Sequence, residues 1–142
     1  MNMISAKQLK NLELMVRLLM SVILLTAGSS KLFSDGGFAA YYAQAFQGEL
    51  RIVLPSGLVA IYLAVIPFIE LALGALLLVN RVRTYALIGW FVFMLTLLIG
   101  HYVLQEWSAV NQMLDYFFLG FLCYVLPSHG RWRDFGFNPD TA

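Results

Sequence analysis

The chain has 142 residues, of which 61% are hydrophobic and only 12% carry a charge. Such a composition excludes an ordinary soluble domain of this length. The formal net charge is +1, and because nucleic-acid binding needs a strongly basic surface, we expect no nucleic-acid partner.

Four long apolar runs account for the hydrophobic content. Each has about 17 to 22 residues, which at a rise of 1.5 Å per residue is enough to cross a hydrocarbon core roughly 30 Å thick. The sequence therefore predicts an all-α fold, a four-helix transmembrane bundle in which residues 1–142 form a single membrane domain. The first run also has the charge pattern of a secretory signal peptide, but we expect it to remain as a helix. The expected helices cover, approximately, residues 14–33, 58–79, 85–104 and 110–126.

The longest connection, residues 34–56, joins the first two expected helices and lies on the outer side of the membrane. Five of its residues, four of them aromatic, recur at helical spacing and predict a short amphipathic helix at the membrane interface. This helix is either an aromatic anchor or a lid over an outward-facing cavity. The five residues are Phe38, Tyr41, Tyr42, Ala45 and Phe46.

The distribution of basic residues predicts the orientation, because Lys and Arg next to helix ends tend to stay in the cytoplasm. In a four-crossing arrangement only Lys31 and Arg51 fall on the outer side. Both termini, including the tail at residues 127–142, are therefore expected in the cytoplasm. The basic residues on the inner side are Lys7, Lys10, Arg17, Arg81, Arg83, Arg131 and Arg133.

Glu70 lies inside the apolar stretch VIPFIELALG. A charged side chain at the bilayer centre costs roughly 2.5–3.5 kcal/mol, so it usually faces protein or water and has a partner. The first expected helix carries one stripe of polar or small residues along an otherwise apolar surface, and this stripe should face the bundle interior. The stripe consists of Arg17, Ser21, Gly28 and Lys31.

Four residues form the candidate ligand-binding site: Lys31, Glu70, His101 and Asp115. Counting the helical rise from the helix ends places Lys31 about 3 Å, Asp115 about 9 Å and Glu70 about 20 Å below the outer surface. His101 lies near the outer end of the third helix. We therefore expect Lys31 to pair with Asp115 and not with Glu70, which leaves room for water or a small polar headgroup. The alternative is a structural role, with a Lys31–Asp115 ion pair and a protonated or hydrogen-bonded Glu70.

Nearer the cytoplasm, Glu13 precedes Arg17 by one helical turn, an order that predicts a structural ion pair. Cys123 is the only cysteine in the sequence, and the two histidines, His101 and His129, belong to opposite faces of the membrane. An intramolecular disulfide, a thiolate metal cluster and bis-histidine haem ligation are therefore excluded within one chain. We expect no metal and no intrinsic cofactor.

The segments RLLMSVILLTAGSSKLF, LPSGLVAIYLAVIPFIELALGALLLV and NQMLDYFFLGFLCYVL, taken in this order, resemble the DoxX family and its relative MauE. The resemblance covers roughly residues 15–126. It implies a multi-pass protein of the bacterial inner membrane, in which Lys31, Glu70 and Asp115 match recurrent polar positions. DoxX-type chains are associated with thiosulfate:quinone oxidoreductase and other membrane redox assemblies, and MauE-type chains assist maturation of a periplasmic amine dehydrogenase. MauE members often carry a cysteine pair after the third helix, whereas GHYVLQEWSAVN has none, which argues against thiol exchange.

Two functions from different classes follow. The first is an integral membrane subunit or accessory protein of a quinone-linked redox complex, with a quinone or lipid headgroup bound at the candidate site. The second is a non-catalytic assembly factor or scaffold for a membrane or periplasmic partner, or a homo-oligomer. In neither case do we expect the chain to be an enzyme by itself. A solute carrier is disfavoured, because no inverted repeat and no pair of broken helices is visible.

Overall fold

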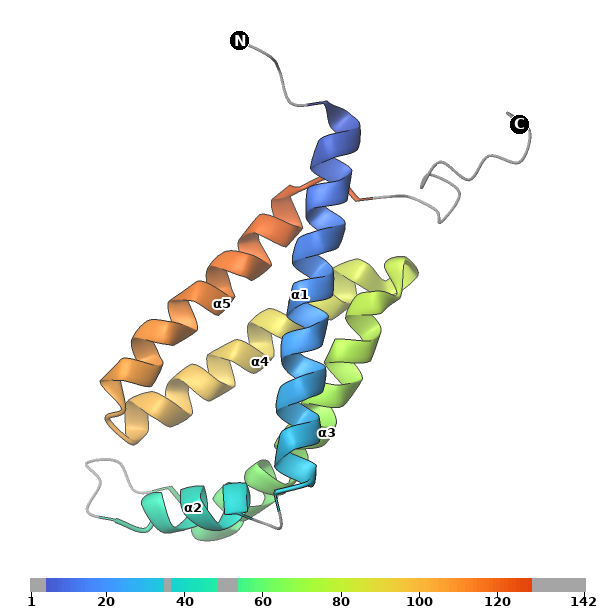
Figure 1. Ribbon diagram of the computed structural model, residues 1–142. Coiled ribbons are helices and arrows are strands. Elements are labelled where there is room, and N and C mark those ends of the chain that lie inside the picture. Colours follow the sequence, from blue (N-terminus) through green and yellow to red (C-terminus); the bar gives the residue numbers. More distant parts are fainter. Residues whose placement is uncertain (1–4, 35–36, 49–53, 129–142) are drawn as a thin grey trace.

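The computed structural model describes residues 5–34, 37–48 and 54–128, and all regular secondary structure in these stretches is helical. The expected tail at 127–142 lies almost entirely outside the described residues, as does Arg51. The described residues form four long α-helices and one short one, and Figure 1 shows their arrangement. In chain order the elements are α1 (Ala6–Leu32), α2 (Gly37–Ala45), α3 (Ser56–Leu78), the 3₁₀ turn η1 (Asn80–Val82), α4 (Arg83–Val103) and α5 (Trp107–Val125).

All four expected long helices are present, but α1 begins well before its apolar run. A reciprocal cap starts it: the Ser5 hydroxyl accepts a hydrogen bond from the Gln8 amide at 3.3 Å, and the Gln8 side chain accepts one from the Ser5 amide at 2.8 Å. This capping box satisfies amides that would otherwise lack partners. The polar segment ahead of the apolar run is therefore helical as well, which hydropathy alone could not indicate.

In the part of the chain that the structure describes, three segments are long and apolar enough to cross a membrane: Ala6–Leu32, Ser56–Leu78 and Asn80–Val103. The chain is therefore a multi-pass membrane protein. The helix α5 is not among the three, since its first half carries Asn111, Gln112 and Asp115. A fourth crossing is thus an interpretation of its packing against α4 and does not follow from its composition.

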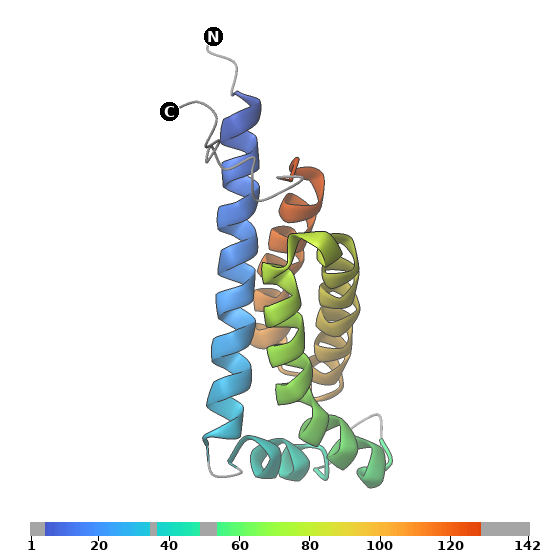
Figure 2. The ribbon, with the colours of Figure 1, turned by 90° about the vertical axis from the view of Figure 1, so that its right-hand side faces the viewer.

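The helices α1 and α3 pack antiparallel along most of their length (Figures 1 and 2). Their contact confirms the predicted inward stripe: the Ser21 hydroxyl donates to the Gly74 carbonyl at 2.7 Å, and Arg17 donates to the Leu77 carbonyl at 3.1 Å. A Cβ on Gly28 would lie only 2.8 Å from the Pro67 carbonyl oxygen. Small residues thus let the two backbones approach closely, as is typical of helix pairs in membranes.

A cluster of charged side chains links three helices at the end of the bundle where α1 begins. The predicted pair is confirmed, with Arg17 Nε 3.1 Å from the carboxylate of Glu13, which is fully buried. Arg83, at the start of α4, adds a second cation whose Nε lies 2.7 Å from the same carboxylate. Its terminal nitrogen also donates to the carbonyls of Cys123 and Leu126 at the end of α5. One carboxylate therefore ties together three helices.

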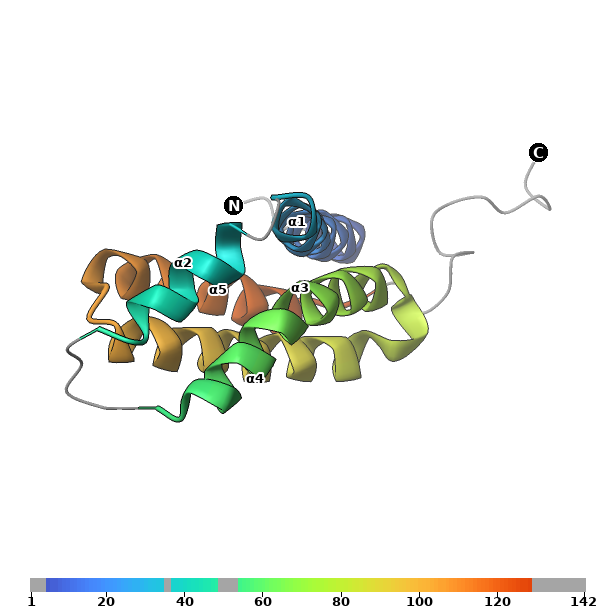
Figure 3. The ribbon, with the colours of Figure 1, turned by 90° about the horizontal axis from the view of Figure 1, so that it is seen from below.

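The helix α2 crosses the opposite end of the bundle and runs beside the first turns of α3 (Figure 3). A short helix in this connection was predicted, and it is present. Most of its rings face the bundle: Phe38 and Tyr42 pack against the core, as does Phe46 just after the end of α2, whereas Tyr41 is 61% exposed. The aromatic side of α2 therefore closes that end of the helix bundle.

Candidate functional site

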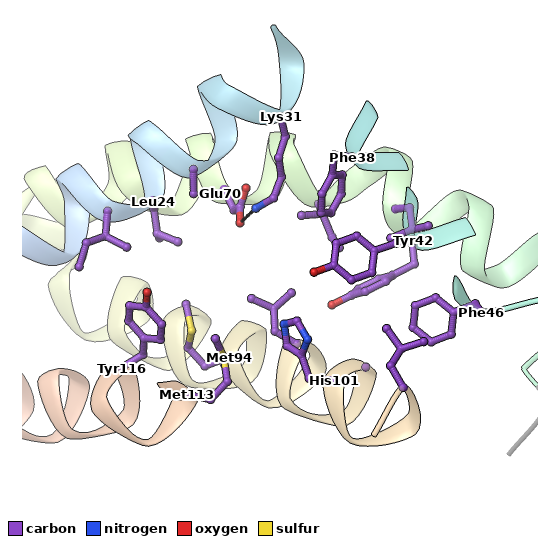
Figure 4. A pocket seen from close by; sticks show the side chains of 18 residues that line it. Leu24, Lys31, Phe38, Tyr42, Phe46, Glu70, Met94, His101, Met113 and Tyr116 are labelled. Carbon is purple, nitrogen blue, oxygen red and sulfur yellow. Dashed lines mark hydrogen bonds and ion pairs between the residues drawn. The ribbon is translucent and has the colours of Figure 1, made fainter. Parts of the chain in front are cut away.

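A cavity of about 200 Å³ lies in the half of the bundle nearest α2, and all five α-helices contribute to its wall (Figure 4). Most of the wall is apolar. One wall residue from each helix, in chain order, is Leu24, Tyr42, Ile66, Leu97 and Met113. Since polar groups are few, their positions determine what the cavity can bind.

Lys31 and Glu70 form an ion pair at the wall of this cavity. The prediction that Lys31 pairs with Asp115 and does not reach Glu70 was wrong. Gly28, one turn before Lys31, packs against Pro67 and Glu70, so these parts of α1 and α3 lie at the same level. The first ten or so residues of α3 consequently extend about 15 Å beyond the end of α1. Counting depth from the first apolar residue of α3 therefore placed Glu70 too far from Lys31.

The carboxylate of Glu70 is only half satisfied. Its Oε1 accepts from Lys31, while its Oε2 is buried and has no hydrogen-bond partner among the described residues. The residue as a whole is 2% exposed. A buried acceptor without a partner costs about 1–3 kcal/mol, so this oxygen favours a donor arriving from the cavity.

The ammonium of Lys31 is held from two sides. Besides Glu70, it faces the ring of Phe38 at 5.0 Å from the ring centroid, a cation–π contact that joins α1 to α2. Its side chain keeps 19% of its surface exposed, compared with 3% for Glu70. Lys31 therefore has further donors for a ligand in the cavity, and Glu70 also lines the cavity wall although it is far less exposed.

His101 also lines the cavity, on the side nearer α2. Its Nδ1 lies 2.6 Å from a carboxylate oxygen of Glu106, just after the end of α4. This contact orients the ring. Because a carboxylate oxygen accepts hydrogen bonds, Nδ1 is the ring nitrogen that carries the proton in this contact. Tyr42 packs edge-on against the His101 ring, with centroids 6.2 Å apart. Burial, with a smaller effect of the Glu106 charge, raises the pKa of Tyr42, so the phenol stays a hydrogen-bond donor.

Asp115 does not belong to this site. It is exposed on the outside of α5, and no ion pair or hydrogen bond joins it to any described residue. Its neighbours Met113 and Tyr116 do line the cavity, so the rotation of α5 points the adjacent side chains inward and Asp115 outward. Three of the four predicted residues are thus brought together, and the fourth is not.

Several polar groups of the site were not predicted. Glu106 follows His101 by five residues, and the tight turn between them, in which Gln105 has φ 58°, brings the two together. The Tyr62 hydroxyl donates to Thr96 at 2.6 Å and links α3 to α4 beside the cavity. The separation of His101 and Glu106 could have suggested a pair, but nothing in the sequence indicates the Tyr62–Thr96 contact.

Within the three described stretches, no group of three or more His, Cys, Asp or Glu side chains could hold a metal ion. What the cavity offers is a cation, an unsatisfied carboxylate oxygen and hydrogen-bonding rings set in apolar walls. This chemistry suits a lipid-soluble molecule with a polar head.

These features define a helical, multi-pass membrane protein with a cavity between its helices and a partly buried ion pair in the cavity wall. The family model described as "Methylamine utilisation protein MauE" matches residues 9–113. The chain belongs to the MauE family, one of the DoxX/MauE-like membrane proteins, which confirms the resemblance seen in the sequence. Among curated proteins and solved structures, none matches the chain.

Proposed function

We propose that this MauE-family protein is an accessory subunit of a bacterial quinone-linked redox complex and that its cavity binds the head of an isoprenoid quinone. The observation that carries the proposal is the Lys31–Glu70 pair, with one buried carboxylate oxygen left without a partner at the wall of an apolar cavity. Redox chemistry belongs to the quinone and to the partner subunits, while this chain binds and orients the ring.

The pair suits both redox forms of a quinone. A quinone carbonyl accepts a hydrogen bond, which the ammonium of Lys31 can donate. A quinol hydroxyl also donates, and the free Oε2 of Glu70 is an acceptor for it. The phenol of Tyr42 and the ring of His101 offer further contacts toward the α2 side of the cavity.

Two features favour a quinone over a phospholipid headgroup. A phosphate placed at Lys31 would also meet the carboxylate of Glu70, and like charges in a site of low dielectric repel each other strongly. The cavity is also small: an apolar cavity of about 150 Å³ holds benzene, so about 200 Å³ suits one substituted ring. The isoprenoid tail of the quinone then leaves between helices into the bilayer.

The membrane arrangement that goes with this function has four crossings, with α5 as the fourth. The helix has 19 residues and packs along α4, so it lies in the same layer of the membrane. The beginning of α1 and the end of α5 lie at one end of the bundle, and α2 lies at the other (Figure 1). With the basic residues of the first end in the cytoplasm, the cavity opens toward the outer half of the inner membrane.

A second candidate is a non-catalytic assembly factor for a periplasmic enzyme. The family description, which names methylamine utilisation, supports it. So does the exposed polar side of α5, which faces away from the chain's own helices. In this case the cavity charges serve helix packing, and no small molecule binds there.

Quinone binding can be measured through Trp90, which is fully buried and whose indole nitrogen donates to the Tyr116 carbonyl at 3.1 Å, beside the cavity. In a background in which Trp107 and Trp132 are Phe, a short-chain quinone such as decylubiquinone is titrated into protein in mild detergent. We expect saturable quenching of Trp90, together with a quinone in lipid extracts of the purified protein.

Lys31→Met should raise the Kd of decylubiquinone at least tenfold, and Glu70→Gln should raise the Kd of the reduced form, decylubiquinol, by a similar factor, as expected for the loss of a charged hydrogen bond of about 1.5–3 kcal/mol. Lys7→Met removes an exposed lysine far from the cavity and is the matched control. If the quenching of Trp90 fluorescence does not saturate with added quinone and is equal in all variants, the cavity is not a quinone site. A stoichiometric protein partner without any quinone would favour the assembly factor.

A further inference from the structure

The polar side of α5 consists of Ser108, Asn111, Gln112 and Asp115, all of which are exposed. Their spacing of three, four and seven residues aligns them in one stripe along the helix. The opposite side of α5 packs against α4 and α1, so the stripe faces away from the bundle. A polar stripe in a membrane helix normally faces protein or water, yet none of the helices that the structure describes covers this one.

Asp115 lies near the middle of α5. At the standard helical rise, about 12 Å of helix precede it and about 15 Å follow it. Apolar side chains flank it, with Leu114 62% and Phe118 66% exposed. No hydrogen bond or ion pair joins Asp115 to any described residue. In the four-crossing arrangement proposed above, this carboxylate lies within the membrane, where a carboxylate usually has a partner, so a cation from outside the described residues would complete it.

A second copy of this chain is a poor candidate for the partner that covers the polar side of α5. Two copies related by a two-fold axis along the membrane normal present the same face to each other, so an axis that passes through the stripe would bring the two Asp115 carboxylates close together. The cation at the outer half of the described chain, Lys31, is already engaged by Glu70. Lys7 and Lys10 belong to the first turns of α1 and Arg81 belongs to η1, and these parts of the fold lie toward the other end of the bundle from α2. Charge complementarity therefore favours a different protein.

We infer that the polar side of α5 docks a transmembrane helix of another protein, and that this helix carries a Lys or Arg in its membrane-spanning part opposite Asp115. The inference deepens the accessory role proposed above by stating the chemistry of the partner, and it does not depend on what fills the cavity. The amide groups of Asn111 and Gln112 add hydrogen bonds between helices, and Phe118 adds apolar contact.

The full-length protein can test this without knowledge of the natural partner. It is reconstituted in lipid vesicles with a labelled, leucine-rich transmembrane peptide that carries one central lysine, and association is followed by energy transfer. The comparison peptide has leucine in place of the lysine. We expect the lysine peptide to associate about tenfold more tightly, in line with the 1–2 kcal/mol found for polar contacts between membrane helices.

Variants of the protein test whether Asp115 causes the tighter association of the lysine peptide. In Asp115→Asn the preference for lysine should be lost, while in Gln112→Leu, which removes a neighbouring amide but keeps the carboxylate, most of it should remain. In Asp115→Lys the preference should reverse toward a peptide with a central glutamate. Decylubiquinone quenching of Trp90 should be unchanged in Asp115→Asn, so failure of the docking surface and failure of the quinone site are distinguishable.

Two outcomes would overturn the inference. One is equal association of the lysine and leucine peptides with the wild-type protein, which needs no variant to fold. The other is strong energy transfer between two labelled copies of the chain that disappears in Asp115→Asn, because this would make the stripe a homodimer interface.

Discussion

Arg83, at the start of α4, lies 2.7 Å from the carboxylate of Glu13, seventy positions earlier on α1, and also donates to carbonyls at the end of α5. These contacts place one guanidinium at the junction of three helices. The end carbonyls of a helix have no partner within that helix, so Arg83 both neutralises Glu13 and caps α5.

Arg83→Leu should destabilise the protein by about 3 kcal/mol, the low end of the cost of removing one partner from a buried ion pair. Glu13 would keep Arg17 but lose its shorter ion contact, and the carbonyls at the end of α5 would lose their donor. The measurement is thermal unfolding in mild detergent. Arg81→Leu is the matched control, since Arg81 is exposed in the same connection, and equal melting of the two variants would contradict the role of Arg83.

Cys123 provides an independent measure of the same junction. Its side chain is fully buried, with Sγ 3.8 Å from the Glu13 carboxylate. We expect a maleimide to leave the folded protein unlabelled and to label it fully after denaturation in SDS. Arg83→Leu should raise the labelling rate several-fold under native conditions, because the end of α5 loses its anchor. Rapid labelling of the native wild-type protein would show that α5 is not packed in this way.

Gly28→Ala should separate α1 from α3. A Cβ there would lie 2.8 Å from the Pro67 carbonyl oxygen and 3.1 Å from the Glu70 Cβ, and a backbone carbonyl cannot move aside as a flexible side chain can. Overpacking of this kind costs about 1–3 kcal/mol, and the shift should also weaken quinone quenching of Trp90. Gly57→Ala is the control: its Cβ would meet nothing within 4 Å. If Gly28→Ala melts like Gly57→Ala, the helices are not in close contact at this point.

Lys31→Met and Glu70→Leu together separate structure from ligand binding. Each single variant leaves one charge of the pair without its partner and should cost about 3 kcal/mol. The double variant removes both charges, so it should recover most of that stability, as buried pairs replaced by apolar residues often do. It should nevertheless fail to bind decylubiquinone. Recovery of both stability and binding would show that the pair only holds α1 to α3.

Local spacing was sufficient for much of the fold. Hydropathy and length predicted four long helices, and the i, i+4 order of Glu13 and Arg17 predicted an ion pair that the structure contains. The inward stripe of α1 was predicted for the same reason, because the angle between residues on one helix is fixed by its geometry. Ser21 and Gly28 do lie against α3.

The sequence by itself determined the membrane class, the family and the face that α1 turns inward. Only the tertiary structure decided that Lys31 meets Glu70, that Asp115 points outward and that Arg83 reaches Glu13. These contacts depend on how far one helix slides along another and how each is rotated about its axis. Both quantities are set by packing between helices, here by Gly28 against Pro67, and no periodicity within a single helix encodes them.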